Sequence, residues 1–117
     1  DYKVTGVQTC ALPICELWRG PHGAVVADAL PVAGRDGSLA QRFVGGVAAG
    51  RVLAKTGSID YVVSLSGYLP RPQPGKAPLA FAILTNGITG DAAEATRAID
   101  ACVETFARCV GWLSPLR

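Results

Sequence analysis

The sequence predicts an α+β fold in which antiparallel strands form a small sheet and a C-terminal helix packs across it. Residues 61–69 alternate apolar and polar side chains, the period of two that is typical of a strand with one buried face. Residues 79–85 are almost continuously apolar, as in a central strand covered on both faces. Residues 91–110 place apolar side chains at the 3.6-residue spacing of an amphipathic helix.

The region before these segments is expected to be loop and short helix. Prolines and glycines interrupt residues 16–50 repeatedly, so that no long periodic run can form. Ser38 can cap a short helix that would continue through Arg42. Arg35 and Asp36 are adjacent in a glycine-rich turn, where we expect them to form an ion pair.

A third strand is predicted at residues 51–55, between a glycine boundary and Gly57. We expect this strand to pair with residues 61–69 through a tight connection at residues 57–60. Residues 70–78 contain four prolines and can be neither helix nor central strand. They therefore predict an exposed hairpin loop.

The helix at residues 91–110 carries recognisable end signals. Asp91 can cap the first amide groups, and Glu94 follows three residues later, as in a capping box. Gly111 is the expected stop, and Glu104 with Arg108 is spaced for an ion pair along the helix. The stripe expected to pack on the sheet comprises Ala95, Ile99, Cys102, Val103, Phe106 and Val110.

Composition limits the size and the partners of the protein. With 117 residues there is room for one small domain or for part of a larger one. Half of the residues are hydrophobic and the mean hydropathy is +0.31, which suits a piece that the rest of its protein covers. A net charge of +2 with dispersed basic residues argues against nucleic acid. No apolar run approaches the roughly 18 residues of a transmembrane helix.

The four cysteines show no metal-ligand pattern, since His22 is the only histidine and no Cys-x-x-Cys occurs. We therefore expect no metal and no cofactor. Cys102 and Cys109 are seven residues apart on one predicted helix, about 10.5 Å of rise, which is too far for a disulfide. Both are expected to be small buried side chains on one helix face.

Residues 4–14 resemble the conceptual translation of a common sequencing-library adapter fused in frame to a truncated gene. On this interpretation residues 1–15 are a non-native segment and residues 16–117 are native. No secretory signal is readable in the segment, because it lacks a continuous apolar core and a small-residue cleavage site. The alternative is a genuine short strand at residues 4–9, ended by Pro13.

The most informative motif is Lys55-Thr56-Gly57, followed by Ser58. In serine acyl-transfer enzymes that bind penicillins, a Lys-Thr-Gly triplet on a strand edge works beside a Ser-x-x-Lys nucleophile and a Ser-x-Asn element, and this chain contains neither of the latter two. With its flanking runs, residues 30–39, 63–68 and 79–87, the triplet resembles the C-terminal part of the D-alanyl-D-alanine carboxypeptidases among the class C low-molecular-mass penicillin-binding proteins.

This resemblance implies a fragment of a penicillin-binding or β-lactamase-like transpeptidase fold. It implies that Lys55 holds the terminal carboxylate of a D-Ala-D-Ala peptide and favours proton transfer at the nucleophile, while Thr56 donates a hydroxyl to the same carboxylate. Gly57 would let the substrate backbone approach, and the Ser58 amide would be an oxyanion donor. Ser58 replaces the more usual threonine, and Asp60-Tyr61 replaces a small pair.

The resemblance further implies peptidoglycan stem peptides and β-lactams as partners of the full-length protein, and a periplasmic or secreted location. The fragment alone is expected to be inactive, because the nucleophile would lie upstream. The alternative from another class is a noncatalytic α+β binding or interaction domain in which Lys55-Thr56-Gly57 is only a turn.

Overall fold

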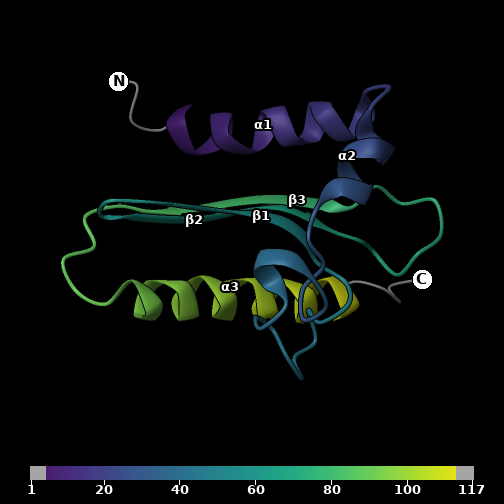
Figure 1. Cartoon of the computed structure of the whole chain (residues 1–117). Helices are drawn as coiled ribbons and strands as arrows, with labels where there is room; N and C mark the ends of the chain where they lie inside the picture. The colour runs from purple at the N-terminus through teal and green to yellow at the C-terminus, as the bar shows by residue number, and fades with distance from the viewer. Residues whose placement is uncertain (1–4, 113–117) are drawn as a thin grey trace.

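The computed structural model describes residues 5–112 and has three layers. A three-stranded antiparallel sheet lies in the middle, with one long helix on each face (Figure 1). These helices are α1 (Thr5–Arg19) and α3 (Ala92–Trp112), and the shorter α2 (Gly23–Ala29) follows α1. The predicted α+β class, with an antiparallel sheet and a C-terminal helix across it, is confirmed.

The sheet has the order β1-β2-β3, formed by β1 (Leu53–Ile59), β2 (Val62–Leu69) and β3 (Leu79–Thr85). The predicted pairing of the first two strands is confirmed, but two boundaries were wrong. The first strand does not end at Lys55 but continues through the triplet to Ile59, and the tight connection is Asp60-Tyr61. Tyr61 takes the left-handed φ of 63° that reverses the chain there.

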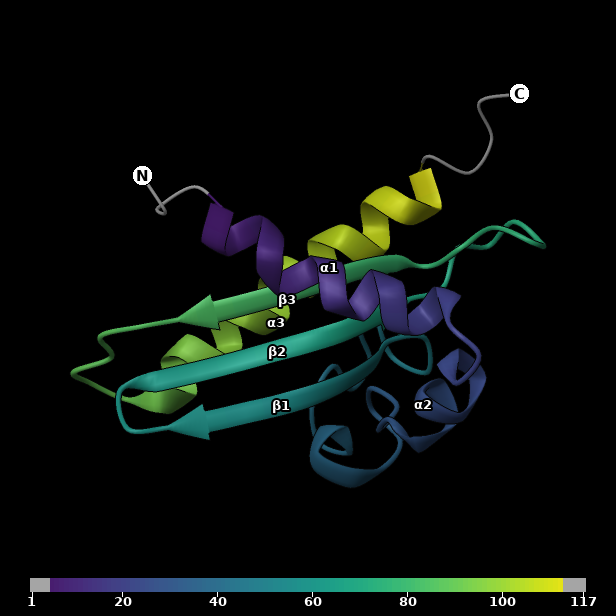
Figure 2. The same ribbon diagram turned by 90° about the horizontal axis from the view of Figure 1, so that it is seen from above.

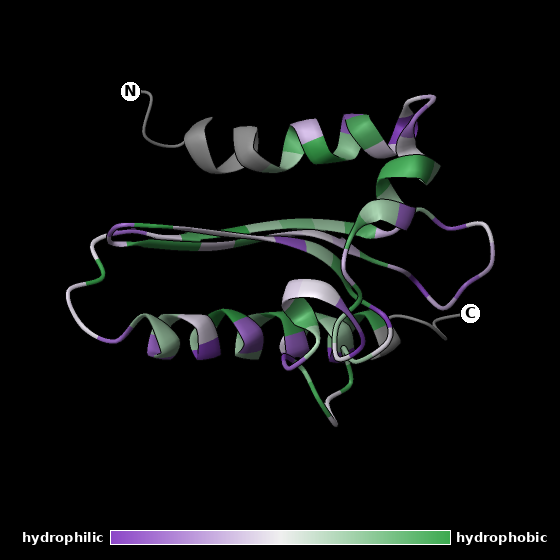
Figure 3. Ribbon diagram, viewed as in Figure 1, coloured by the Kyte–Doolittle hydropathy of each residue, from purple (hydrophilic) through white to green (hydrophobic). Residues whose placement is uncertain are grey.

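One face of the sheet packs on α3 and contains the core. Directly opposed residues of antiparallel strands share a face, so the buried side chains Val63 and Leu65 of β2 define this side. On α3 the fully or almost fully buried positions recur every three or four residues, and hydrophilic residues lie on the side away from the sheet (Figure 3). The buried helix residues are Ile99, Val103, Ala107 and Val110.

The ends and the outer face of α3 differ partly from prediction. The Asp91 carboxylate accepts the Ala93 N–H at 2.9 Å, as expected of a cap. Gly111 does not stop the helix, which extends to Trp112. Cys102 and Cys109 are exposed free thiols, so their predicted burial was wrong. Each is one residue from a buried position, and one residue turns a helix by about 100°.

The N-terminal helix α1 covers most of the segment interpreted as non-native and the first residues of the region expected to be loop and short helix. The alternative of a strand at residues 4–9 is contradicted, because Thr5–Arg19 is one helix that includes Pro13. Helix α1 covers the sheet face opposite α3, where the ring centroids of Trp18 and Tyr68 are 5.0 Å apart. The Tyr68 hydroxyl donates to the Ile14 carbonyl at 2.7 Å. Burial, and secondarily Cys15, raise the pKa of Tyr68 above its ordinary value.

Residues 30–52 connect α2 to β1 without a long helix or strand. The expected helix from Ser38 through Arg42 is reduced to the 3-10 turn η1 (Gly37–Leu39), in which Ser38 is a member and not the cap. Residues 70–78 form the predicted exposed loop between β2 and β3. In the part of the chain that the structure describes, no helix is both long and apolar enough to cross a membrane.

Candidate active site

The triplet Lys55-Thr56-Gly57 lies within β1, an edge strand of the sheet. Its inner edge pairs with β2 in the register Lys55↔Ser66, Thr56↔Leu65 and Gly57↔Ser64. Its outer edge has no strand partner among residues 5–112, apart from a single bridge from Val32 to Leu53 at the strand start. An exposed strand edge offers backbone groups that an extended peptide can pair with.

Side chains of the triplet point to both faces of this edge. Thr56 and Ser58 share the face of Leu65 and Val63, which is the α3 side. Lys55 and Gly57 share the opposite face, on which α1 lies over β3 and leaves β1 uncovered (Figure 2). Because β1 is an edge strand, the side chains on both of its faces lie beside the same unpaired strand edge.

Lys55 is exposed and available to a ligand. Within the residues that the structure describes, its side chain forms one hydrogen bond, from Nζ to the carbonyl oxygen of Thr56, the next residue, at 2.7 Å. A lysine ammonium has three donors, so this local bond leaves further donors for an anion. No partner carboxylate contacts Lys55 in the described structure.

Gly57 is an interior position of β1, where it pairs with Ser64 of β2. A Cβ at this position would meet the Ser64 hydroxyl, and a rotation of that small side chain would relieve the contact. Packing therefore tolerates a glycine here without requiring one, although the sequence pattern indicated a strand end.

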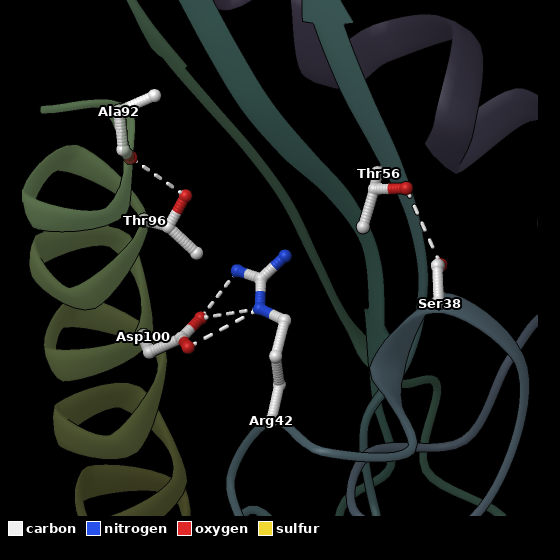
Figure 4. Close-up of polar contacts among 6 residues, drawn as sticks. All are labelled: Ser38, Arg42, Thr56, Ala92, Thr96 and Asp100. Carbon is white, nitrogen blue, oxygen red and sulfur yellow. Dashed lines mark hydrogen bonds and ion pairs between the residues drawn. The ribbon is translucent and has the colours of Figure 1, made fainter.

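Ser38 contacts the triplet, which sequence reasoning did not predict. Its Oγ lies 3.3 Å from Thr56 Oγ1, so that η1 places a second hydroxyl beside the triplet (Figure 4). The two residues are 18 positions apart, and both hydroxyls face solvent-accessible space. Ser38 lies in the flanking run that supports the family resemblance, but nothing in that run signals a contact with Thr56.

The segment that carries Ser38 is attached to α3 by charged side chains. Arg42 donates from Nε to both Asp100 oxygens at 3.1 and 3.2 Å, and from Nη2 to Oδ1 (Figure 4). Glu104 accepts the backbone N–H groups of Val47 and Ala48 at 2.9 and 3.3 Å. Glu104 therefore binds this segment and does not form the predicted pair with Arg108.

The predicted ion pair between Arg35 and Asp36 is also wrong. The Asp36 carboxylate accepts the backbone N–H of Val32 at 2.8 Å instead, which closes the turn before η1. A backbone donor four residues away is fixed in place, whereas an exposed arginine side chain must be ordered to form a pair.

A cavity of 370 Å³ opens at the hairpin end of β1, next to the triplet. Ser58, Asp60 and Tyr61 line it together with the start of α3. Lys55, Thr56 and Gly57 do not line it, so the cavity adjoins only the last of the four predicted site residues. Across residues 5–112, no group of three or more histidine, cysteine, aspartate or glutamate side chains is arranged to hold a metal ion.

The sequence of this chain matches those of known proteins. Residues 17–109 match the D-Ala-D-Ala carboxypeptidase 3 (S13) family. A D-alanyl-D-alanine carboxypeptidase of Actinomadura sp. (strain R39) is 41% identical over 100 residues, covering 81% of this chain and 18% of that protein.

Solved structures agree with this match. A predatory endopeptidase from Bdellovibrio bacteriovorus, in complex with an immunity protein, gives a TM-score of 0.61 at 26% identity over 74% of this chain and 22% of that one. Penicillin-binding protein 4 from Haemophilus influenzae gives 0.55 at 26% identity over 73% and 19%. The chain thus spans about a fifth of the length of these relatives. With its family match covering most of its length, the chain belongs to the D-Ala-D-Ala carboxypeptidase 3 (S13) family.

Proposed function

We propose that this chain is the C-terminal part of a serine-type D-Ala-D-Ala carboxypeptidase that acts on peptidoglycan stem peptides outside the cytoplasm. The observation that carries the proposal is the placement of Lys55-Thr56-Gly57 on an uncovered edge strand, within the segment that matches the family. An active-site wall needs both an open strand edge for the substrate peptide and a fixed cation for its carboxylate.

In the proposed reaction, a serine from the remainder of the protein attacks the carbonyl carbon of the penultimate D-alanine. The peptide C–N bond breaks, the leaving amine takes a proton, and free D-alanine departs. Water then hydrolyses the acyl-serine ester, which regenerates the serine and releases the shortened peptide. β-Lactams would acylate the same serine by opening of their ring amide.

The residues of this chain have distinct proposed roles in that reaction. Lys55 supplies a positive charge that holds the substrate carboxylate and favours proton transfer at the serine. Thr56 donates its hydroxyl to the carboxylate, and Gly57 leaves room for the substrate backbone. The Ser58 N–H stabilises the oxyanion, a contribution of roughly 3 kcal/mol for one such donor.

We propose separately that the N-terminal segment is not native. Residues 1–15 would be the non-native adapter-derived part and residues 16–117 the C-terminal part of the catalytic domain. In support, the family match begins at residue 17. Sequencing the gene from its natural source tests this point, because a native sequence identical to residues 1–15 would refute it.

Recovery of the full-length protein tests the function itself. We expect Ser-x-x-Lys and Ser-x-Asn elements upstream, release of D-alanine from an acyl-D-Ala-D-Ala peptide, and covalent labelling by a fluorescent penicillin. The 117-residue chain alone should give neither product nor adduct. A full-length protein that lacks both upstream elements and releases no D-alanine would favour the noncatalytic binding domain.

A further inference from the structure

The contact between Ser38 and Thr56 connects the triplet to a segment that precedes β1. Their oxygens are 3.3 Å apart, and Thr56 donates to Ser38. Ser38 is exposed, whereas Leu39 next to it is fully buried. The hydroxyl therefore extends from an anchored backbone toward Thr56 of β1 (Figure 4).

The backbone around Ser38 is held from several directions. Gly37 before it takes a left-handed φ of 53°, and a Cβ there would lie 3.0 Å from Pro31. Gly34 donates to the Leu39 carbonyl at 2.9 Å, which closes the turn around the serine. On the other side, Arg42 is bound to Asp100 of α3 by a two-pronged pair. Ser38 is thus presented by a fixed segment, although its own side chain is exposed.

We infer that Ser38 is a positioning residue for Thr56 in carboxylate binding, an inference that rests on the proposed function. A hydroxyl has one proton and two lone pairs. A carboxylate can only accept hydrogen bonds, so when the substrate arrives it accepts one from the Thr56 hydroxyl, which then no longer donates to Ser38. The Ser38 hydroxyl then rotates and donates a hydrogen bond to Thr56 Oγ1. The resulting chain, Ser38 to Thr56 to carboxylate, orients and polarises the donor.

This role predicts a particular kinetic signature. The substrate carboxylate belongs to the leaving D-alanine and keeps the same charge while the neighbouring amide is attacked, so its contact with Thr56 contributes about equally to the ground state and to the transition state. Loss of such uniform binding raises KM and leaves kcat unchanged. In the full-length protein, Ser38→Ala should raise KM for an acyl-D-Ala-D-Ala peptide about two- to tenfold, the range of one neutral hydrogen bond. Ser38→Thr, which keeps the hydroxyl, should restore KM.

A double-mutant cycle separates positioning of Thr56 from any other effect of Ser38. If Ser38 acts through Thr56, then Ser38→Ala should change KM by less than about twofold once Thr56→Val is present. Thr105→Ala is the matched control, because that hydroxyl donates only to the Ala101 carbonyl of its own helix at 2.9 Å. It should leave KM unchanged. Ser38→Cys keeps the side-chain size with a weaker donor and replaces Ser38→Ala if the latter folds poorly.

The outcomes distinguish this inference from the function on which it rests. A folded Ser38→Ala protein with wild-type KM would overturn the inference and leave the carboxypeptidase activity intact. An equal KM effect of Ser38→Ala with and without Thr56→Val would also overturn it, because Ser38 would then act independently of Thr56. A wild-type protein that releases no D-alanine would overturn the proposed function and the inference together.

Discussion

Replacement of Arg42 by alanine should destabilise the chain through loss of the attachment between residues 30–52 and α3. The Arg42 and Asp100 side chains are only 15% and 20% exposed, and the guanidinium reaches both carboxylate oxygens. It also lies 5.6 Å from the centroid of the Phe43 ring, which is part of the core. Removal of Arg42 would leave the largely buried Asp100 carboxylate without a cation.

The size of this effect follows from the burial of the pair. Loss of one partner of a fully buried ion pair costs about 3–5 kcal/mol. An exposed pair is worth about 0–1 kcal/mol. Since water reaches roughly a fifth of each side chain, we expect Arg42→Ala to lower the free energy of unfolding by about 2–3 kcal/mol. This is a large share of the total for a small domain, which is about 5–15 kcal/mol.

Urea denaturation of the 117-residue chain, followed by circular dichroism, measures this change. Arg35→Ala is the matched control, because Arg35 is exposed and forms no ion pair within the described residues; it should cost less than about 0.5 kcal/mol. In a cycle with Asp100→Ala, the coupling energy should be at least about 1 kcal/mol. If Arg42→Ala were as mild as Arg35→Ala, the two-pronged pair would not hold this segment, and the reasoning would be refuted.

Two further substitutions test the sheet. Gly67→Ala should destabilise the chain by about 1–3 kcal/mol in the same assay, because the added Cβ would collide with the Leu53 carbonyl of β1. Gly90→Ala is the control and should be neutral, because its Cβ would meet open space. Equal effects of the two substitutions would contradict the close approach of β1 to β2. For Tyr68, a pKa raised in the folded state means that its stabilising contribution is complete below pH 10 and is lost as pH rises through the folded pKa. Stability measured between pH 8 and about pH 11 should therefore fall more steeply for the wild type than for Tyr68→Phe, and parallel curves would show that Tyr68 is not shifted.

Local sequence patterns located β2, β3 and α3, but the expectation of a central strand at residues 79–85 was wrong, because β3 is an edge strand of the sheet that the structure describes. Alternation in residues 61–69 and the helical stripe through Ile99 and Val103 each reflect one buried face, which the sequence encodes within a few residues. The same local reasoning misplaced the end of β1 at the triplet. Gly57 resembled a stop, but it is an interior position of β1, because β2 continues the pairing past it from Gly57↔Ser64 to Ile59↔Val62.

Contacts between distant segments could not be predicted in this way. Arg42 and Asp100 are 58 residues apart, and Glu104 binds backbone amides more than 50 residues away. Neither pairing has a spacing signal, because both depend on how residues 30–52 fold against α3. The contact of Ser38 with Thr56 was missed for the same reason. Lys55, Thr56, Gly57 and Ser58 were found as candidates by motif, and their catalytic roles stay predictions.

The most direct test of the account is acylation of the full-length protein with Lys55 replaced by alanine. Lys55 is exposed, and its only described hydrogen bond is to the neighbouring Thr56 carbonyl, so folding should be preserved. The rate of labelling by a fluorescent penicillin should fall at least about tenfold, equivalent to roughly 1.4 kcal/mol in the barrier. Lys76→Ala, in the exposed loop between β2 and β3, should label at the wild-type rate. A folded Lys55→Ala protein that is acylated as fast as the wild type would contradict the assignment of the triplet to the active site.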